Sequence, residues 1–291
     1  MTILQEILAH KRDEVRSNKE LYPIKLLERS TYFTSQTVSL KKYLQRSDLL
    51  GIIAEIKRKS PSKGYINRYI SVEELSIGYM QAGASALSVL TDEKYFGGSA
   101  QDLRLARQAN FCPILRKEFI VDEYQIVEAK AIGADVILLI AAALTPAQVA
   151  SFSAFARSFG LEVLLEVHTK EELASHLCDS VDLVGINNRD LHTFTIDVRN
   201  SLEIGALVPP GMIKISESGL DDAATVVRLK QAGFNGFLIG EAFLKSAKPD
   251  QACGMFIEAI RQGLHVVNGS AGQREAQPSA QTEFVAKKTV T

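Results

Sequence analysis

Two side chains of opposite charge stand near the end of a short apolar segment in GIIAEIKRKSPSKG, residues 51–64. Side chains alternate between the two faces of a strand, so Glu55 and Lys57 point the same way. A carboxylate and an ammonium group held side by side can orient each other for proton transfer, which is general acid–base chemistry. The same residues are also typical of a structural ion pair at a strand exit, followed by a plain turn of serine, proline and glycine.

Eight apolar segments alternate with longer amphipathic segments after about residue 50. Strands are expected at 51–57, 86–90, 113–119, 135–140, 162–168, 183–188, 212–217 and 236–240. The alternation predicts a parallel sheet, and eight repeats in about 210 residues predict a closed (β/α)8 barrel, the TIM barrel of the α/β class. An open, doubly wound sheet is disfavoured because no dinucleotide-binding fingerprint follows the first strand.

Five of these strands end in charged or amide side chains. The residues are Glu55 and Lys57, Lys117, Glu166, Asn187, and Glu217 with Ser218 directly after it. In a barrel of this kind the C-terminal ends of the strands meet at one face, where active sites form. The N-terminal halves of the same strands carry little charge, so the pattern indicates a catalytic mouth and not a solvated rim.

The last two predicted units carry short turns that contain glycine, SESG after the seventh strand and IGEA after the eighth. Loops at these positions of a barrel commonly bind phosphate through backbone N–H groups. Gly219 and Gly240 could also be turn residues without a ligand. Their joint placement favours a phosphate site.

Two segments lie outside the predicted barrel domain, which spans residues 51–263. Residues 1–50 are expected to form an N-terminal helical extension, because Ile3, Ile7 and Leu8 lie along one side of a helix and need a partner surface. Residues 264–291 are expected to be a disordered C-terminal tail, because from Asn268 onward they are small and polar and lack periodicity.

The composition is that of a soluble globular protein. The chain has 291 residues, 46% hydrophobic and 23% charged, with a formal net charge of −1, which does not favour binding to nucleic acid or a membrane surface. Three scattered cysteines and five scattered histidines lack the spacing of a disulfide framework or a metal site, so no metal is expected and a reducing cytoplasm fits best. The oligomeric state cannot be read from the sequence, and a monomer is compatible with it.

Six segments taken together closely resemble the indole-3-glycerol phosphate synthase family of tryptophan biosynthesis. They are AEIKRKSPSKG (54–64), SVLTDEKYFGGS (88–99), ILRKEF with the following IVDEYQI (114–126), GINNRDL (185–191), SESG (216–219) and LIG (238–240). The resemblance covers residues 1 to about 263. It implies a (β/α)8 barrel with an N-terminal helical extension, in agreement with the pattern of strands and helices.

The resemblance implies a lyase reaction that needs no cofactor. The enzyme would close the indole ring of 1-(2-carboxyphenylamino)-1-deoxyribulose 5-phosphate and release carbon dioxide and water. Lys117 would be the general acid toward the substrate carbonyl, and Glu166 would handle protons during the later dehydration. Lys57 would neutralise the substrate and share the acid role. Glu55, Asn187 and Ser218 would hold substrate groups and orient the lysines.

The resemblance also implies a set of substrate-binding residues. Ser60 and Arg189 would lie near the anthranilate carboxylate, Phe96, Phe119 and Leu138 near the aromatic ring, and Gly219, Gly240 and Glu241 at the phosphate, with Glu217 also in the binding site. Independently of the family, a lysine can donate a proton at neutral pH if neighbouring charge or burial lowers its pKa. We therefore expect such a shift at Lys117.

Two positions depart from the family pattern. Glu118 stands where the family often has aspartate, and alternation along the strand predicts that it faces away from the barrel interior. Glu241 stands where many members have serine beside the phosphate. An inward carboxylate would repel phosphate, but the expected contact is a backbone N–H group, which does not depend on the side chain.

Two other functions remain open. One is another barrel enzyme with a phosphorylated substrate, such as a sugar-phosphate isomerase or an aldolase that uses Lys117 as a Schiff base. The second lysine and the SPSKG loop argue against it. The other is a non-catalytic binding protein on a barrel scaffold, which the intact set of proton-transfer residues disfavours.

Overall fold

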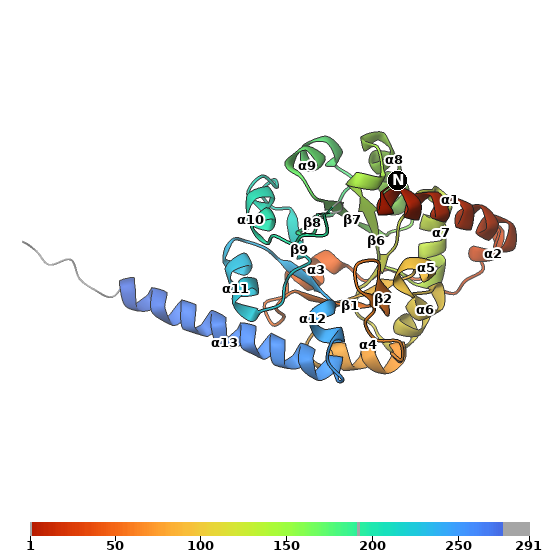
Figure 1. Ribbon diagram of the computed structural model, residues 1–291. Coiled ribbons are helices and arrows are strands. Elements are labelled where there is room, and N and C mark those ends of the chain that lie inside the picture. The colour runs from red at the N-terminus through yellow and green to blue at the C-terminus, as the bar shows by residue number, and fades with distance from the viewer. Residues whose placement is uncertain (1, 191–192, 276–291) are drawn as a thin grey trace, which may run out of the picture.

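Eight parallel strands close into a barrel in the computed structural model, which describes residues 2–190 and 193–275 (Figure 1). The strands are β1 (Ile52–Ile56), β4 (Ala86–Leu90), β5 (Ile114–Lys117), β6 (Val136–Ile140), β7 (Glu162–Val167), β8 (Leu183–Asn187), β9 (Ile213–Glu217) and β10 (Gly236–Ile239). Each strand pairs with its neighbour in sequence order, and β1 pairs with β10 to complete the barrel. The predicted (β/α)8 barrel is confirmed, and its strands differ from the predicted ranges only at their ends.

The helices follow the strands and surround the barrel (Figure 1). They are α4 (Val72–Gln81), α6 (Ala100–Ala109), α7 (Glu123–Ile132), α8 (Pro146–Ser158), α9 (Lys170–His176), α10 (Arg199–Gly205), α11 (Ala223–Gln231) and α13 (Pro249–Glu275), with short turns at α5 (Glu93–Phe96), η1 (Ala141–Ala143) and α12 (Glu241–Leu244). Local sequence explains their starts: Thr145 caps α8 through a capping box with Gln148, and Pro146 takes the first helical position. A small hairpin of β2 (Lys59–Ser60) and β3 (Gly64–Tyr65) lies in the loop after β1.

The strands bury both of their faces, as parallel barrel strands must. Ile53, Leu138 and Leu164 belong to the apolar cluster that fills the barrel, whereas Ile52 and Ala54 pack in the layer between the strands and the helices. The inner cluster includes Leu40 and Leu44 of α3 (Leu40–Leu44), which pack on side chains from the first residues of the strands. The end of the barrel opposite the polar strand ends is therefore covered by the N-terminal extension.

The first helix of the extension, α1 (Ile3–Leu21), packs against the barrel and is followed by the short α2 (Ile24–Leu27). Ile7 and Leu8 are buried, which confirms that this side of the helix meets a partner surface. Lys11 is fully buried on the same helix, and its Nζ atom lies 3.0 Å from Asp92 and 3.1 Å from Glu118. Glu118 therefore points away from the barrel interior, as the strand alternation predicts.

The last helix is longer than the sequence pattern indicates. α13 extends to Glu275, past the predicted domain boundary at residue 263. The expectation of a disordered tail is therefore wrong for residues 264–275, where one backbone hydrogen-bonding pattern continues without a break. Residues 276–291 lie outside the described part of the chain. Among the described residues, no helix combines the length and the apolar character that crossing a membrane requires.

Candidate active site

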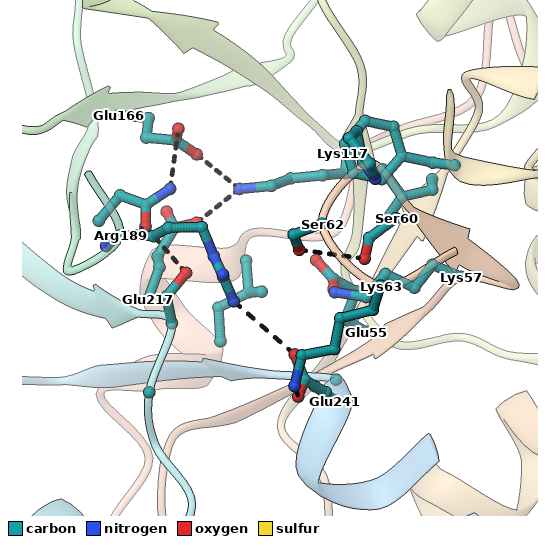
Figure 2. A pocket seen from close by; sticks show the side chains of 18 of the residues that line it. Glu55, Lys57, Ser60, Ser62, Lys63, Lys117, Glu166, Arg189, Glu217 and Glu241 are labelled. Carbon is teal, nitrogen blue, oxygen red and sulfur yellow. Dashed lines mark hydrogen bonds and ion pairs between the residues drawn. The ribbon is translucent and has the colours of Figure 1, made fainter. Parts of the chain in front are cut away.

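A cavity of about 280 Å³ lies at the C-terminal ends of the barrel strands (Figure 2). Its lining includes every residue predicted from the sequence: Glu55, Lys57, Ser60, Phe96, Lys117, Phe119, Leu138, Glu166, Asn187, Arg189, Glu217, Ser218, Gly219, Gly240 and Glu241. These residues come from all eight strands and the loops after them. The structure brings them together in one cavity, and the individual roles assigned to them stay predictions.

Lys117 lies at the centre of the polar half of this cavity. It is the last residue of β5, and its ammonium group donates hydrogen bonds to Glu166 Oε2 at 2.7 Å and Glu217 Oε2 at 2.5 Å. Figure 2 shows the side chain extending between these two carboxylates, which come from β7 and β9. All three side chains are largely buried, so the lysine is held in one orientation by two charge-assisted hydrogen bonds.

The pKa of Lys117 is raised, which is opposite to the expectation from the sequence. Burial by itself favours the neutral amine, but the carboxylates of Glu166, Glu217 and Glu55 outweigh that effect. The prediction of a lowered pKa is wrong because it did not include three carboxylates around one ammonium group. Lys117 is therefore a fully charged proton donor at neutral pH.

The two carboxylates that share Lys117 have different environments. Burial raises the pKa of Glu217 to about 7 against the opposing effect of Lys117, and the nearby charge of Glu166 adds to the rise. Among the described residues, Glu217 Oε1 is buried without a hydrogen-bond partner. For Glu166, Lys117 and His168 outweigh the effect of burial and lower the pKa. Glu166 is thus the ionised member of the pair and Glu217 the one that carries a proton more readily.

Glu217→Gln should change how stability depends on pH. Because the pKa of Glu217 is raised to about 7 in the folded protein, the folded state binds more protons than the unfolded chain between about pH 5 and 7. Stability should therefore fall as the pH rises through this range, by up to about 3 kcal/mol from this residue. Urea unfolding of wild type and Glu217→Gln across this range should show a shallower decline in the variant.

The matched control for that measurement is Glu258→Gln, which removes an exposed carboxylate paired with Arg261 on α13. Its stability curve should run parallel to that of the wild type. Parallel curves for Glu217→Gln as well would mean that Glu217 is ionised throughout this pH range.

Asn187 and Ser218 form a small network that orients Glu166. Asn187 donates from Nδ2 to Glu166 Oε1 at 3.2 Å, and its Oδ1 atom accepts from Ser218 Oγ at 2.8 Å and from the Arg189 N–H group at 3.0 Å. Ser218 has a φ of 68°, in the left-handed region that non-glycine residues rarely adopt. This conformation costs free energy, and here it accompanies the turn that carries Ser218 and Gly219 over the cavity.

Glu55 and Lys57 form the ion pair expected from their alternation, with Nζ and Oε1 2.5 Å apart. Gly240 packs closely on this pair, since a Cβ atom at position 240 would stand 2.7 Å from Glu55 Oε1 and 2.9 Å from Glu55 Cβ. The absence of a side chain at Gly240 therefore has a packing reason in addition to any role toward a ligand.

Glu241 points into the cavity and is surrounded by positive charge (Figure 2). It forms a hydrogen bond with Lys63 and ion pairs with Lys245 at 2.9 Å and Arg189 at 3.7 Å. Although partial burial opposes ionisation, the hydrogen bonds from Lys63 and Lys245 lower the pKa of Glu241 to about 2. The carboxylate is neutralised by its neighbours, an arrangement that the sequence does not reveal.

The opposite wall of the cavity is apolar. The rings of Phe96 and Phe119 pack with centroids 5.9 Å apart, and Leu138 lies in the same lining. Ile3, Leu4 and Ile7 of α1 also line the cavity. The sequence pattern placed Ile3 and Ile7 on the side of the helix that needs a partner surface, and it did not identify Leu4. Which of these side chains reach the cavity depends on where α1 docks on the barrel.

One further residue near the site was not predicted. His168 lies two residues after Glu166, and its Nε2 atom is 3.5 Å from Glu166 Oε1. Its position on the same side of the strand end is the signal that could have identified it. Within residues 2–190 and 193–275, no group of histidine, cysteine and acidic side chains is arranged to hold a metal ion.

Comparisons with known proteins agree with this geometry. Residues 4–255 match the family described as "Indole-3-glycerol phosphate synthase". A Bacteroides thetaiotaomicron protein of that name is 48% identical over 89% of this chain and 99% of its own length. Another of that name, from Salinibacter ruber, is 42% identical over 87% of this chain and 94% of its own length.

Among solved structures, tryptophan synthase subunit alpha from Legionella pneumophila superposes with a TM-score of 0.56. The match covers 78% of this chain and 98% of that protein, at 14% sequence identity, so it shows the shared barrel fold alone. The family match and the two relatives reach further, because they extend over almost the whole barrel and the N-terminal extension. The chain belongs to the indole-3-glycerol phosphate synthase family.

Proposed function

We propose that this protein is an indole-3-glycerol phosphate synthase, a carboxy-lyase of tryptophan biosynthesis. Its substrate is 1-(2-carboxyphenylamino)-1-deoxyribulose 5-phosphate, which it converts to indole-3-glycerol phosphate, carbon dioxide and water. The observation that carries this proposal is Lys117, a buried ammonium group held between Glu166 and Glu217 next to an aromatic wall. Together with family membership, this arrangement supports proton-assisted attack of an aromatic ring on a carbonyl group.

The first step forms the carbon–carbon bond of the new ring. The aromatic carbon that bears the carboxylate attacks the ketone carbon, and Lys117 protonates the ketone oxygen as charge develops on it. Positive charge appears at the same time on the anilino portion, where Glu55 and Glu166 can stabilise it. The carboxylate then leaves as carbon dioxide, and the electron pair of the broken bond restores the aromatic ring.

The second step removes water. The nitrogen lone pair expels the hydroxyl group formed in the first step, and the carbon next to the nitrogen loses a proton. Glu166 is placed to take this proton and return it to the departing hydroxyl group, because Asn187 and Lys117 hold both of its oxygen atoms. Lys57 offsets the negative charge of the substrate from its position beside Glu55.

Substrate binding divides between the two walls of the cavity. Phe96, Phe119 and Leu138 support contact with the aromatic ring, and the cations at the other side support the anionic groups. We assign the phosphate to the backbone around Gly219 and Gly240, with Lys63 and Lys245 nearby, and the anthranilate carboxylate to Ser60 and Arg189. No cofactor takes part in this scheme, because side chains supply all of the proton transfers.

We also propose a cytoplasmic enzyme that acts on a small phosphorylated molecule and does not bind nucleic acid. A monomer is compatible with the sequence. The three cysteines are free thiols, two of them buried, which fits a reducing compartment. The formal charge of −1 fits a protein without a polyanion partner. Size-exclusion chromatography with light scattering tests the oligomeric state.

The direct test is an assay of purified protein with the carboxyphenylamino substrate, following indole absorbance and carbon dioxide release. Both products should appear in equal amounts with no added metal or cofactor. Folded protein that forms neither would refute the proposed function and favour a binding role. Omitting the substrate carboxylate, with the unsubstituted phenylamino analogue, should abolish carbon dioxide release and serves as the chemical control.

Glu241→Ser should tighten substrate binding moderately. The change removes a carboxylate that pairs with Lys63, Lys245 and Arg189, so the two lysines become available to the substrate phosphate and Arg189 to the anthranilate carboxylate. We expect KM to fall by less than about tenfold at low ionic strength, with a smaller difference in high salt because screening weakens these interactions. Steady-state kinetics at two salt concentrations measure this.

The matched control is Glu203→Ser, which removes a carboxylate from an exposed pair with Lys170 and should leave KM unchanged. A tenfold or larger rise in KM for Glu241→Ser would show that the carboxylate has a positive role in binding, for example by holding Lys63 in place.

A further inference from the structure

The proposed ring closure takes up one proton from solvent in each turnover. The substrate carboxylate leaves as neutral carbon dioxide, and two oxygen protonations, at the ketone and at the departing hydroxyl, are balanced by only one proton lost from carbon. If Glu166 carries the carbon-derived proton to the hydroxyl group, the remaining proton comes from Lys117. Lys117 must then be reprotonated before the next turnover, and this reasoning rests on the proposed function.

Reprotonation through the mouth of the cavity is hindered by the position of Lys117. Its side chain is only 14% exposed, and both of its carboxylate partners are more deeply buried. Substrate and product occupy the same mouth. A second route from solvent to this group of residues would let the lysine regain its proton independently of their exchange.

His168 lies between Glu166 of β7 and Glu172 of α9. Its Nε2 atom lies 3.5 Å from Glu166 Oε1, and its Nδ1 atom lies 3.5 Å from Glu172 Oε2. Glu166 in turn contacts Lys117 through its other oxygen, Oε2, at 2.7 Å. Four side chains that can carry a proton therefore lie next to one another in the order Glu172, His168, Glu166 and Lys117.

The imidazole is buried, with its side chain 9% exposed, and among the described residues neither ring nitrogen has a hydrogen-bond partner. Hydrogen bonds fix the backbone around it: the His168 N–H group donates to Glu172 Oε2 at 2.6 Å, and Asn200 Nδ2 donates to the His168 carbonyl at 3.1 Å. The ring nitrogens thus face two carboxylates at distances slightly beyond hydrogen bonding. Such contacts commonly shorten when a reacting complex forms.

Glu172, at the end of this row of side chains farthest from Lys117, lines a second cavity. It has a volume of about 700 Å³ and is lined by polar residues that include His168, Glu172, Asn200 and Arg199. The Arg199 side chain is 82% exposed, so this cavity borders solvent. The Glu172 side chain is 20% exposed and lines this cavity, so solvent can reach it, whereas Glu166 faces the substrate cavity.

We propose that His168 relays a solvent proton from Glu172 at the second cavity to Glu166, which returns it to Lys117. The protonated imidazole gives its Nε2 proton to Glu166 Oε1. The Glu166 carboxyl group then turns about its Cγ–Cδ bond and gives this same proton to the neutral amine of Lys117. After the ring turns over so that its deprotonated nitrogen faces Glu172, His168 regains a proton from Glu172, which takes one from solvent. Every group ends the cycle in its starting protonation state, and one proton has entered.

The charges around His168 support this role. The titratable groups that face it are Glu166 from β7, Glu172 from α9 and, at longer range, Glu217 from β9, while α10 contributes the neutral Asn200. Burial alone would lower the pKa of His168, but the nearby carboxylates, Glu172 and Glu166 above all, outweigh it and raise the pKa. The imidazole can therefore hold a proton near neutral pH, which a relay requires.

A proton relay through His168 and a purely structural role of His168 predict different rates for the first turnover. Lys117 begins the first turnover with its own proton, so loss of the relay should spare that turnover and slow the later ones. A residue that only supports the fold of the site would slow the first turnover as well. Comparing rapid single-turnover kinetics with the steady state separates the two roles.

The test uses His168→Gln in the full chain at about pH 8, with a weakly buffered indicator dye that reports proton uptake. We expect the first turnover to match wild type within about twofold, and the steady-state rate and proton uptake to fall by at least about tenfold. Added imidazole should restore the steady-state rate with increasing concentration. His265→Gln, at an exposed position on α13, is the matched control and should behave as wild type.

A second variant keeps the test informative if His168→Gln does not fold. Glu172→Gln retains an acceptor for the His168 N–H group but removes the carboxylate at the second cavity, and it should also slow the steady state while sparing the first turnover. A slowed first turnover, an unchanged steady state, or no response to imidazole in His168→Gln would overturn the relay. Wild type without any indole product would instead refute the proposed function itself.

Discussion

Lys117→Met should lower turnover by at least about a hundredfold, the lower end of the effect expected for a positioned general acid. The change removes the ammonium group that bonds both Glu166 and Glu217, while the backbone proposed to bind phosphate and the aromatic side chains of the cavity stay in place. Substrate should therefore still bind, with a dissociation constant within about tenfold of the wild-type value. Single-turnover kinetics and equilibrium binding together measure both quantities.

The same lysine distinguishes the proposed function from an aldolase-like one. A general acid lends a proton and never bonds to substrate carbon, whereas a Schiff-base lysine forms an imine that borohydride reduces. The raised pKa of Lys117 favours the acid role, because imine formation requires the neutral amine. Wild type treated with substrate and borohydride should keep its intact mass, and a stable adduct at Lys117 would contradict the acid role.

Lys25→Met is the control for removing a lysine, since this side chain is exposed on α2. Its turnover should equal that of the wild type. Melting curves of both variants are needed as well, because Lys117→Met leaves Glu166 and Glu217 facing each other without a shared cation. If Lys117→Met is folded, binds substrate and retains more than about a tenth of wild-type turnover, Lys117 is not the principal acid.

Lys11→Met should destabilise the protein by about 3–5 kcal/mol, the cost of breaking a buried ion pair from one side. Lys11 is fully buried, and Asp92 and Glu118 are buried beside it at 3.0 and 3.1 Å, with Glu14 at 2.9 Å. Although burial alone lowers the pKa of Lys11, these carboxylates raise it overall, so the ammonium form is the one that the fold stabilises. Urea unfolding at neutral pH measures the loss.

The loss should extend to substrate binding. Ile3, Leu4 and Ile7 line the cavity from the same helix, so a helix that detaches from Asp92 and Glu118 also removes part of the apolar wall. We expect KM to rise more than the rate of the chemical step falls, since these residues line the cavity and their apolar side chains cannot transfer protons. Steady-state kinetics below the melting transition measure this.

Lys19→Met is the matched control for Lys11→Met, because it removes a lysine from the same helix. Lys19 pairs with Asp122 at 2.7 Å, but both side chains are more than a third exposed, and such surface pairs contribute at most about 1 kcal/mol. A loss of less than about 1 kcal/mol for Lys11→Met too would mean that water or a local shift compensates the buried carboxylates.

Local sequence determined the architecture of this protein and which residues lie together in the candidate active site. Strand and helix periodicity, read over eight repeats, identified the barrel, since each unit buries its own apolar face in the same way. The barrel topology then placed Lys117, Glu166 and Glu217 at one mouth, because the C-terminal ends of parallel strands converge whatever their separation in sequence. Polar residues at those strand ends could therefore be assigned to one site without any coordinates.

Only the tertiary structure decided how those residues act on one another. The partners of Glu241 include Lys63, which is 178 residues away in the chain, and the burial of Lys11 depends on where α1 docks. The pKa of Lys117 was predicted in the wrong direction because electrostatic shifts depend on distances of a few ångströms between several charges at once. Periodic patterns report which face of an element is buried, but they contain no information on those distances.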